Sequence, residues 1–161
     1  MKMSFFMRLG SLALVFATAI FCLIVTAEAA DNEVNFGRKI EGTFILDQNH
    51  ESARSSYLFT EFGSVIWSSS DQKKYSYAPA NGIWEQMDER KARVKIVSFD
   101  FDSNGLAIVH MNFQFDEEFN KVSGSFDGAI YPMDVDVNNI NKKPMQKFSG
   151  PFTGVRLSME K

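Results

Sequence analysis

Two tryptophans, one of them followed directly by an acid, are the residues best suited to hold a small molecule. Trp67 lies in a short apolar segment, and Trp84 precedes Glu85. An indole ring beside a carboxylate can line a binding site, because pockets combine apolar walls with a few placed polar groups. Tryptophan also fills the interiors of small domains. A binding role and a packing role therefore both stay open for this group.

His110 is the histidine whose position the sequence defines best. It alternates with Asn112 and Gln114 on the polar face of a segment whose other face is apolar. If the polar face lines a barrel interior, His110 would lie in a pocket. If the face meets solvent, His110 is an ordinary outer residue, as is usual for a half-buried antiparallel strand.

Other residue types that could do chemistry are sparse. The second histidine, His50, has no partner at ligand spacing, and the one cysteine, Cys22, lies in an apolar N-terminal run, so we expect no metal site and no cofactor. Asp100 and Asp102 alternate with Phe99 and Phe101, and we interpret the acids as the outer face beside a buried aromatic pair. Nucleophile-elbow, Walker and dinucleotide motifs are absent, so the sequence assigns no catalytic residue.

The elements that would position these residues are short strands separated by Gly, Asn, Asp and Ser. Asn104-Gly105 and Gly63 predict tight turns with positive φ. The predicted strands are Ile40–Leu46, Ser56–Thr60, Ser64–Ser68, Ile83–Met87, Lys91–Asp102, Leu106–Phe115, Lys121–Tyr131 and Lys147–Leu157, with a less certain one at Lys74–Tyr77.

About eight strands at hairpin spacing predict an all-β fold, an antiparallel up-and-down barrel that leaves no free sheet edge. A β-sandwich is the alternative architecture. Two glycines, Gly124 and Gly128, fall on one face of a predicted strand, which permits curvature there or the close approach of another backbone.

The first 29 residues have the order of a secretory signal peptide. Basic Lys2 and Arg8 precede an apolar run, and Ala27-Glu28-Ala29 supplies small residues for cleavage after Ala29, or after Ala30. An uncleaved membrane anchor is the alternative. We predict a signal helix at 1–29, a flexible lead-in at 30–39 and the barrel domain at 40–161. The mature protein would be periplasmic or extracellular, with no stable membrane anchor.

Charge narrows the choice of partners. The whole chain carries a net charge of −3, and removal of the signal segment leaves 15 basic and 19 acidic side chains, or −4. The largest basic clusters are pairs, Lys73-Lys74, Arg90-Lys91 and Lys142-Lys143, so we expect no nucleic-acid partner. Cleavage would also remove Cys22, so the mature domain would depend on its core rather than on disulfides.

Several short blocks resemble a family of uncharacterised exported bacterial β-barrel proteins, similar in outline to calycins and to allene oxide cyclase barrels. They are Gly42-Thr43-Phe44, Phe59 to Val65, Gly82-Ile83-Trp84-Glu85, Phe99 to Asp102, Val122 to Phe126, Tyr131-Pro132 and Phe152 to Arg156. The blocks span nearly all of the predicted mature chain. The resemblance implies a barrel and export, and it implies no assigned catalytic residues.

The leading functional hypothesis is a binding module that holds a small apolar or amphipathic molecule. The predicted mature chain keeps 18 aromatic residues, more than a narrow barrel needs for packing. Trp67, Trp84, Glu85 and His110 are the candidate binding residues. One alternative is a cyclase- or isomerase-like enzyme with Glu85 or His110 as its acid. The other is a packed domain that acts through an apolar surface near Pro132–Pro144. The ligand and the oligomeric state are not predicted.

Overall fold

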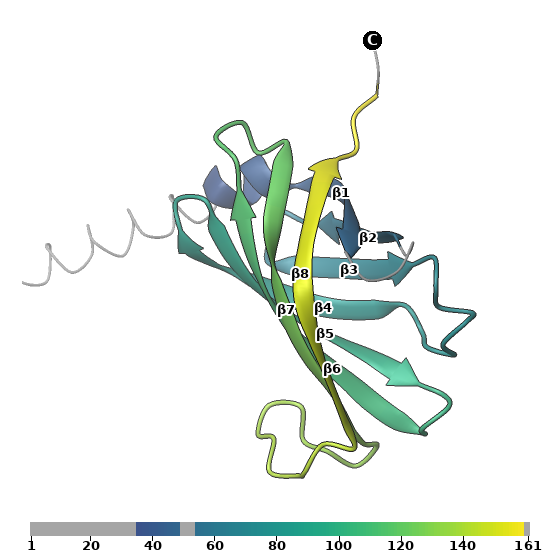
Figure 1. Cartoon of the computed structure of the whole chain (residues 1–161). Helices are drawn as coiled ribbons and strands as arrows, with labels where there is room; N and C mark the ends of the chain where they lie inside the picture. Colours follow the sequence, from purple (N-terminus) through teal and green to yellow (C-terminus); the bar gives the residue numbers. More distant parts are fainter. Residues whose placement is uncertain (1–34, 49–53, 160–161) are drawn as a thin grey trace, which may run out of the picture. The chain divides into compact units, whose positions relative to one another are not determined.

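The structure, a computed structural model, describes residues 35–48 and 54–159. Eight strands form one closed barrel in which each strand pairs antiparallel with the next and β8 pairs with β1 (Figure 1). This confirms the predicted up-and-down barrel over the sandwich. The strands are β1 (Gly42–Gln48), β2 (Arg54–Phe59), β3 (Ser64–Ser69), β4 (Ala80–Asp88), β5 (Lys91–Asp100), β6 (Gly105–Phe115), β7 (Lys121–Pro132) and β8 (Gln146–Arg156).

The predicted signal peptide and its cleavage site lie outside the described residues. Within the described ranges, no helix is long and apolar enough to cross a membrane.

Turn residues behave as their chemistry predicts. Gly63 has a φ of 90° in the β2–β3 turn, and Asn104 has a φ of 50° just before β6. Both values lie in the region that favours Gly and Asn. The segment Lys74–Tyr77, by contrast, is not a strand. It belongs to a turn-rich connection, and only Tyr77 forms a single bridge, to Asp100.

One half of the barrel is filled by aromatic rings. Alternate residues of β1, β2, β6 and β8 point inward, as the two-residue period of a strand requires. The ring centroids of Phe113 and Phe152 are 4.7 Å apart, those of Phe113 and Phe59 are 5.2 Å apart, and those of Phe44 and Phe115 are 5.5 Å apart. These three pairings use five phenylalanines that are at most 2% exposed. Packed rings therefore occupy this half of the interior.

Gly124 explains how β7 fits against this cluster. A Cβ built on Gly124 would lie 1.9 Å from the Asn112 carbonyl oxygen and 2.5 Å from the Phe152 ring. Only a residue without a side chain fits there. Gly128 is similarly placed, because its Cβ would meet the Phe148 ring at 2.3 Å. Another backbone therefore approaches closely at Gly124, as the sequence predicted, whereas at Gly128 the approaching group is a side chain.

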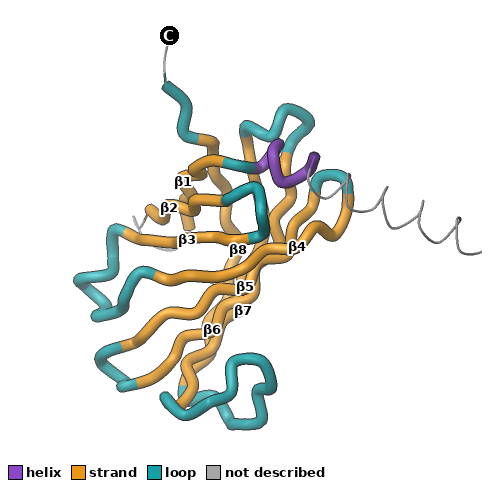
Figure 2. Tube along the Cα trace, turned by 180° about the vertical axis from the view of Figure 1, so that it is seen from behind, coloured by secondary structure: helices purple, strands orange, loops and turns teal. Residues whose placement is uncertain are grey.

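A short helix, residues 35–40, closes the filled end of the barrel (Figure 2). The sequence predicted a polar lead-in and the start of a strand here. Instead Phe36 and Ile40, four residues apart on one helical face, are both buried. The Phe36 ring lies 5.7 Å from Trp84 and 6.0 Å from Phe119, and Arg38 Nε donates to Glu61 Oε1 at 2.6 Å. Burial of two apolar side chains favours a helix in a segment too short for a clear periodic pattern.

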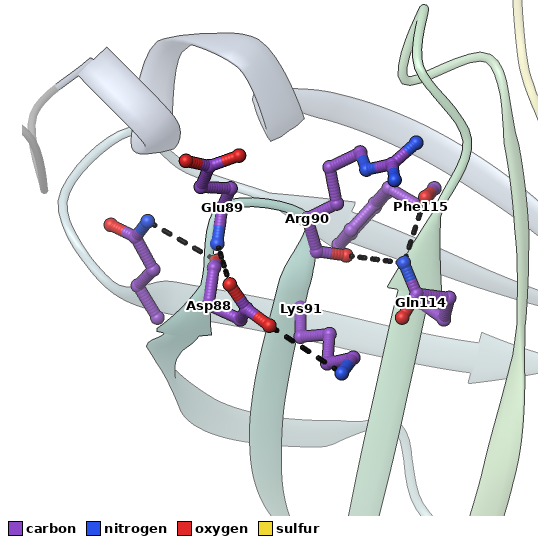
Figure 3. A network of polar contacts seen from close by, with 7 residues as sticks. Asp88, Glu89, Arg90, Lys91, Gln114 and Phe115 are labelled. Atoms are coloured by element: carbon purple, nitrogen blue, oxygen red, sulfur yellow. Dashed lines mark hydrogen bonds and ion pairs between the residues drawn. The ribbon is translucent and has the colours of Figure 1, made fainter.

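The β4–β5 turn at this end is held by a polar network (Figure 3). Glu89 N donates to Asp88 Oδ1 at 2.7 Å, and Lys91 Nζ lies 3.5 Å from Asp88 Oδ2. Gln114 Nε2 donates to the carbonyl oxygens of Arg90 at 3.3 Å and Phe115 at 3.1 Å, which ties the turn to β6. These contacts fix the rim of the closed end.

The long β7–β8 connection packs on the outside of the barrel. Val135 is buried with Leu106 and Ile108 of β6, and Val97 and Tyr131 border this second cluster. This loop therefore covers the outer face of β5–β7 at the end away from the helix.

Candidate functional site

The open end of the barrel contains a pocket of about 730 Å³. It lies beyond the aromatic cluster, at the end of the barrel where the β3–β4, β5–β6 and β7–β8 connections are. Its volume is in the range of roughly 300–1,000 Å³ that is usual for small-molecule sites. The described residues that line it are Gln48, Trp67, Ser69, Asp71, Tyr75, Tyr77, Ser98, Asp100, Asp102, Ser103, Ala107, Phe126, Ile130, Gln146, Phe148 and Pro151.

An aromatic pair forms one wall of this pocket. Trp67 points inward from β3, and its ring stacks on Tyr77 with centroids 5.3 Å apart and planes 20° apart. Tyr77 is held in place because it bridges to Asp100, and the next residue, Ala78, donates its N–H to the Phe99 carbonyl at 3.0 Å. Ser98 Oγ also donates to the Ala78 carbonyl at 2.6 Å. The β3–β4 connection is thus fastened to β5, and the stacked rings have a fixed place.

The opposite wall comes from β7 and β8. Phe126 and Phe148 face each other with ring centroids 6.4 Å apart. Ile130 and Pro151 extend the apolar surface, and Ala107 of β6 contributes a small side chain between them and β5. Because Ala107 is small, the barrel stays open at this level.

Tyr57 separates the pocket from the filled half. Its ring lies 6.4 Å from Trp67 on the pocket side and 5.6 Å from Phe113 on the core side. Burial raises the pKa of the Tyr57 hydroxyl, and the nearby Tyr77 raises it further. Burial also raises the pKa of Tyr77, although a hydrogen bond with Ser69 opposes the change. Both phenols therefore stay neutral at physiological pH and offer no negative charge.

The rim of the pocket is polar and acidic. Asp71, Asp100 and Asp102 line it. Asp100 Oδ1 accepts hydrogen bonds from the N–H and the hydroxyl of Ser103, both at 2.8 Å, so this carboxylate has a defined position. In the described part of the chain, no lysine, arginine or histidine lines the pocket.

The position of Asp100 and Asp102 corrects the interpretation drawn from the sequence. The aromatic pair is outside, with Phe99 51% and Phe101 66% exposed, and the acids border the pocket. The reason is the alternation of side chains along β5. Val94, Ile96 and Ser98 face inward, so the next inward residue is Asp100.

The four predicted binding residues are not brought together. Trp67 lines the pocket. Trp84 is buried at the closed end, where its indole N–H donates to the Thr60 carbonyl at 3.0 Å. Glu85 faces outward and accepts a hydrogen bond of 2.6 Å from Arg93 Nε.

His110 also lies on the outer face, between Lys95 of β5 and Asp127 of β7. Partial burial lowers the pKa of His110, Lys95 lowers it further, and Asp127 opposes the change. The His110 side chain is exposed and is not among the residues that line the pocket, and a binding role for His110 stays a prediction.

Sequence reasoning missed most of the residues that do line the pocket. The sequence predicts a strand at Lys74–Tyr77, which contains Tyr75 and Tyr77, and it does not single out Phe126 or Phe148 as binding residues. The available signal was the polar and aromatic character of the long connection at 70–79, since loops at barrel mouths commonly contribute to binding sites.

Comparisons of this chain with known proteins found no relative. No family model matches the chain, and no curated protein or solved structure gives a significant match.

Proposed function

We propose that this protein binds a small amphipathic molecule in the open half of its barrel. The observation that carries the proposal is the contrast between the two halves: one is filled by phenylalanine rings, and the other holds a pocket of about 730 Å³. An eight-stranded barrel has an interior just wide enough to be packed or to hold one small ligand. This chain combines both conditions.

The pocket chemistry supports an amphipathic ligand. Its deeper walls are apolar, with Phe126, Ile130 and Phe148, while its rim carries carboxylates and amides. Such an arrangement suits a molecule with an apolar body and one polar end. The resemblance that the sequence blocks carry implies a barrel and export, and export would place the binding outside the cytosol.

The test uses a neutral fluorescent probe, N-phenyl-1-naphthylamine, with the purified chain. We expect saturable binding with enhanced emission. Ala107→Trp should weaken it at least about tenfold, because an indole would enter the middle of the pocket. Asn112→Trp is the matched control, since residue 112 lies on the outer face of the same strand. Absence of saturable binding, or equal effects of the two variants, would contradict the proposal.

A further inference from the structure

Among the described residues, the charged side chains that line the pocket are the carboxylates of Asp71, Asp100 and Asp102. Lys74 is not part of the lining, but its Nζ donates a hydrogen bond of 2.7 Å to the hydroxyl of the lining residue Tyr75, so the protein itself places a cation at the mouth. The Asp100 carboxylate is held in one position by two hydrogen bonds that Ser103 donates to it. A preorganised carboxylate stabilises an adjacent positive charge without first having to be ordered.

The aromatic rings at the mouth add a second, independent preference. The faces of Trp and Tyr rings attract cations within about 6 Å of the centroid. The structure contains one such contact at the pocket itself: Lys74 Nζ lies 4.4 Å from the centroid of Tyr75, a residue of the lining. The Trp67–Tyr77 stack offers further ring surface next to the same acids.

From these two features we infer that the polar end of the ligand is a cation, an amine or a quaternary ammonium group. The inference rests on the proposed function and adds the chemical class of the ligand. The cationic head would lie among the rim carboxylates and the tyrosine rings, and its apolar body against the rings of Phe126 and Phe148. A fatty-acid anion carries the opposite charge on its polar end, and three carboxylates at the rim would repel it.

Three probes with the same tail separate the two proposals: decyltrimethylammonium, decanol and decanoate, each below its micellar concentration. Binding is measured by displacement of N-phenyl-1-naphthylamine and by calorimetry at low salt. We expect the cation to bind at least about tenfold more tightly than the alcohol, a difference of about 1.4 kcal/mol. The anion should bind most weakly. Higher salt should reduce the preference, because the rim is partly open to solvent.

Variants then assign the preference to the rim. Asp100→Asn with Asp102→Asn should reduce the preference for the cation to about threefold or less while leaving decanol binding unchanged. The matched control, Glu117→Gln with Glu118→Gln, removes the same charge from the β6–β7 turn at the closed end and should leave the preference intact.

The outcomes are distinct. If no probe binds, the proposed function fails and this inference fails with it. If the alcohol or the anion binds as tightly as the cation, the pocket remains a binding site and the inference about charge is overturned. If both double variants reduce the preference equally, net charge rather than the rim is responsible, and the inference is again overturned.

Discussion

Truncation of one phenylalanine in each half of the barrel would test whether the interior is divided as the structure shows. Phe113 is 2% exposed and has four aromatic neighbours, the nearest being Phe152 at 4.7 Å. Phe113→Ala should lower the free energy of unfolding by about 3–5 kcal/mol, since it removes buried area and leaves a cavity among rigid rings. Phe148→Ala removes a ring that already borders an open pocket, so its cost should be about 1 kcal/mol.

The assay is urea denaturation followed by tryptophan fluorescence and far-ultraviolet circular dichroism, with the midpoint compared at equal slope. Phe101→Ala, at a residue 66% exposed, is the control and should change stability by less than about 0.5 kcal/mol. If Phe113→Ala does not fold, Phe113→Leu gives a smaller loss in the same direction. Equal losses for Phe113→Ala and Phe148→Ala would refute the division into a filled and an open half.

Three further results follow from the same structure. Gly124→Ala should destabilise the fold by about 1–3 kcal/mol because its Cβ would overlap the Asn112 carbonyl, and urea titration beside the exposed control Ser125→Ala would show it. Phe36→Ala should cost about 3–5 kcal/mol by the same assay if the helix closes the barrel, and a loss below about 1 kcal/mol would contradict that role. The lowered pKa of His110 means that the unfolded chain binds more protons just below pH 6.5, so stability should rise with pH there and be complete above it. His110→Gln should flatten that part of the pH profile by less than about 1 kcal/mol, because solvent screens this partly exposed side chain. The measurement is urea denaturation between pH 5 and 7, with Asn112→Gln on the same outer strand face as the control.

The fold could be predicted because its signals are local. Alternation in Leu106–Phe115 and the Asn104-Gly105 turn depend on neighbouring residues alone, and both match β6 and its turn. Closure of the sheet was predicted from strand number and the cost of free edges. The helix at 35–40 could not be predicted in this way, because its stability comes from burial of Phe36 and Ile40 against strands distant in the sequence.

The site was harder to predict because it depends on which face of each strand points inward. For β5, both faces begin with apolar residues, so the pattern did not decide between Phe99 and Asp100. The choice is made by Val94, Ile96 and Ser98, whose inward positions are set by pairing with β4 and β6. A shift of one residue exchanges the faces of a whole strand. This is how the acids came to lie at the pocket and the phenylalanines outside.

The number of aromatic residues does not explain the pocket. Their abundance predicts a surplus that could line a cavity, but most of the phenylalanines of the described barrel fill its closed half. The pocket exists for the opposite reason: at its level the paired inward residues of β5 and β6 are Ser98 and Ala107, whose side chains are too short to fill the space up to the facing wall. The size of inward residues, layer by layer, therefore determines where a barrel of this kind is open. Filling that one layer, as Ala107→Trp would, should remove binding without disturbing the phenylalanine cluster below it.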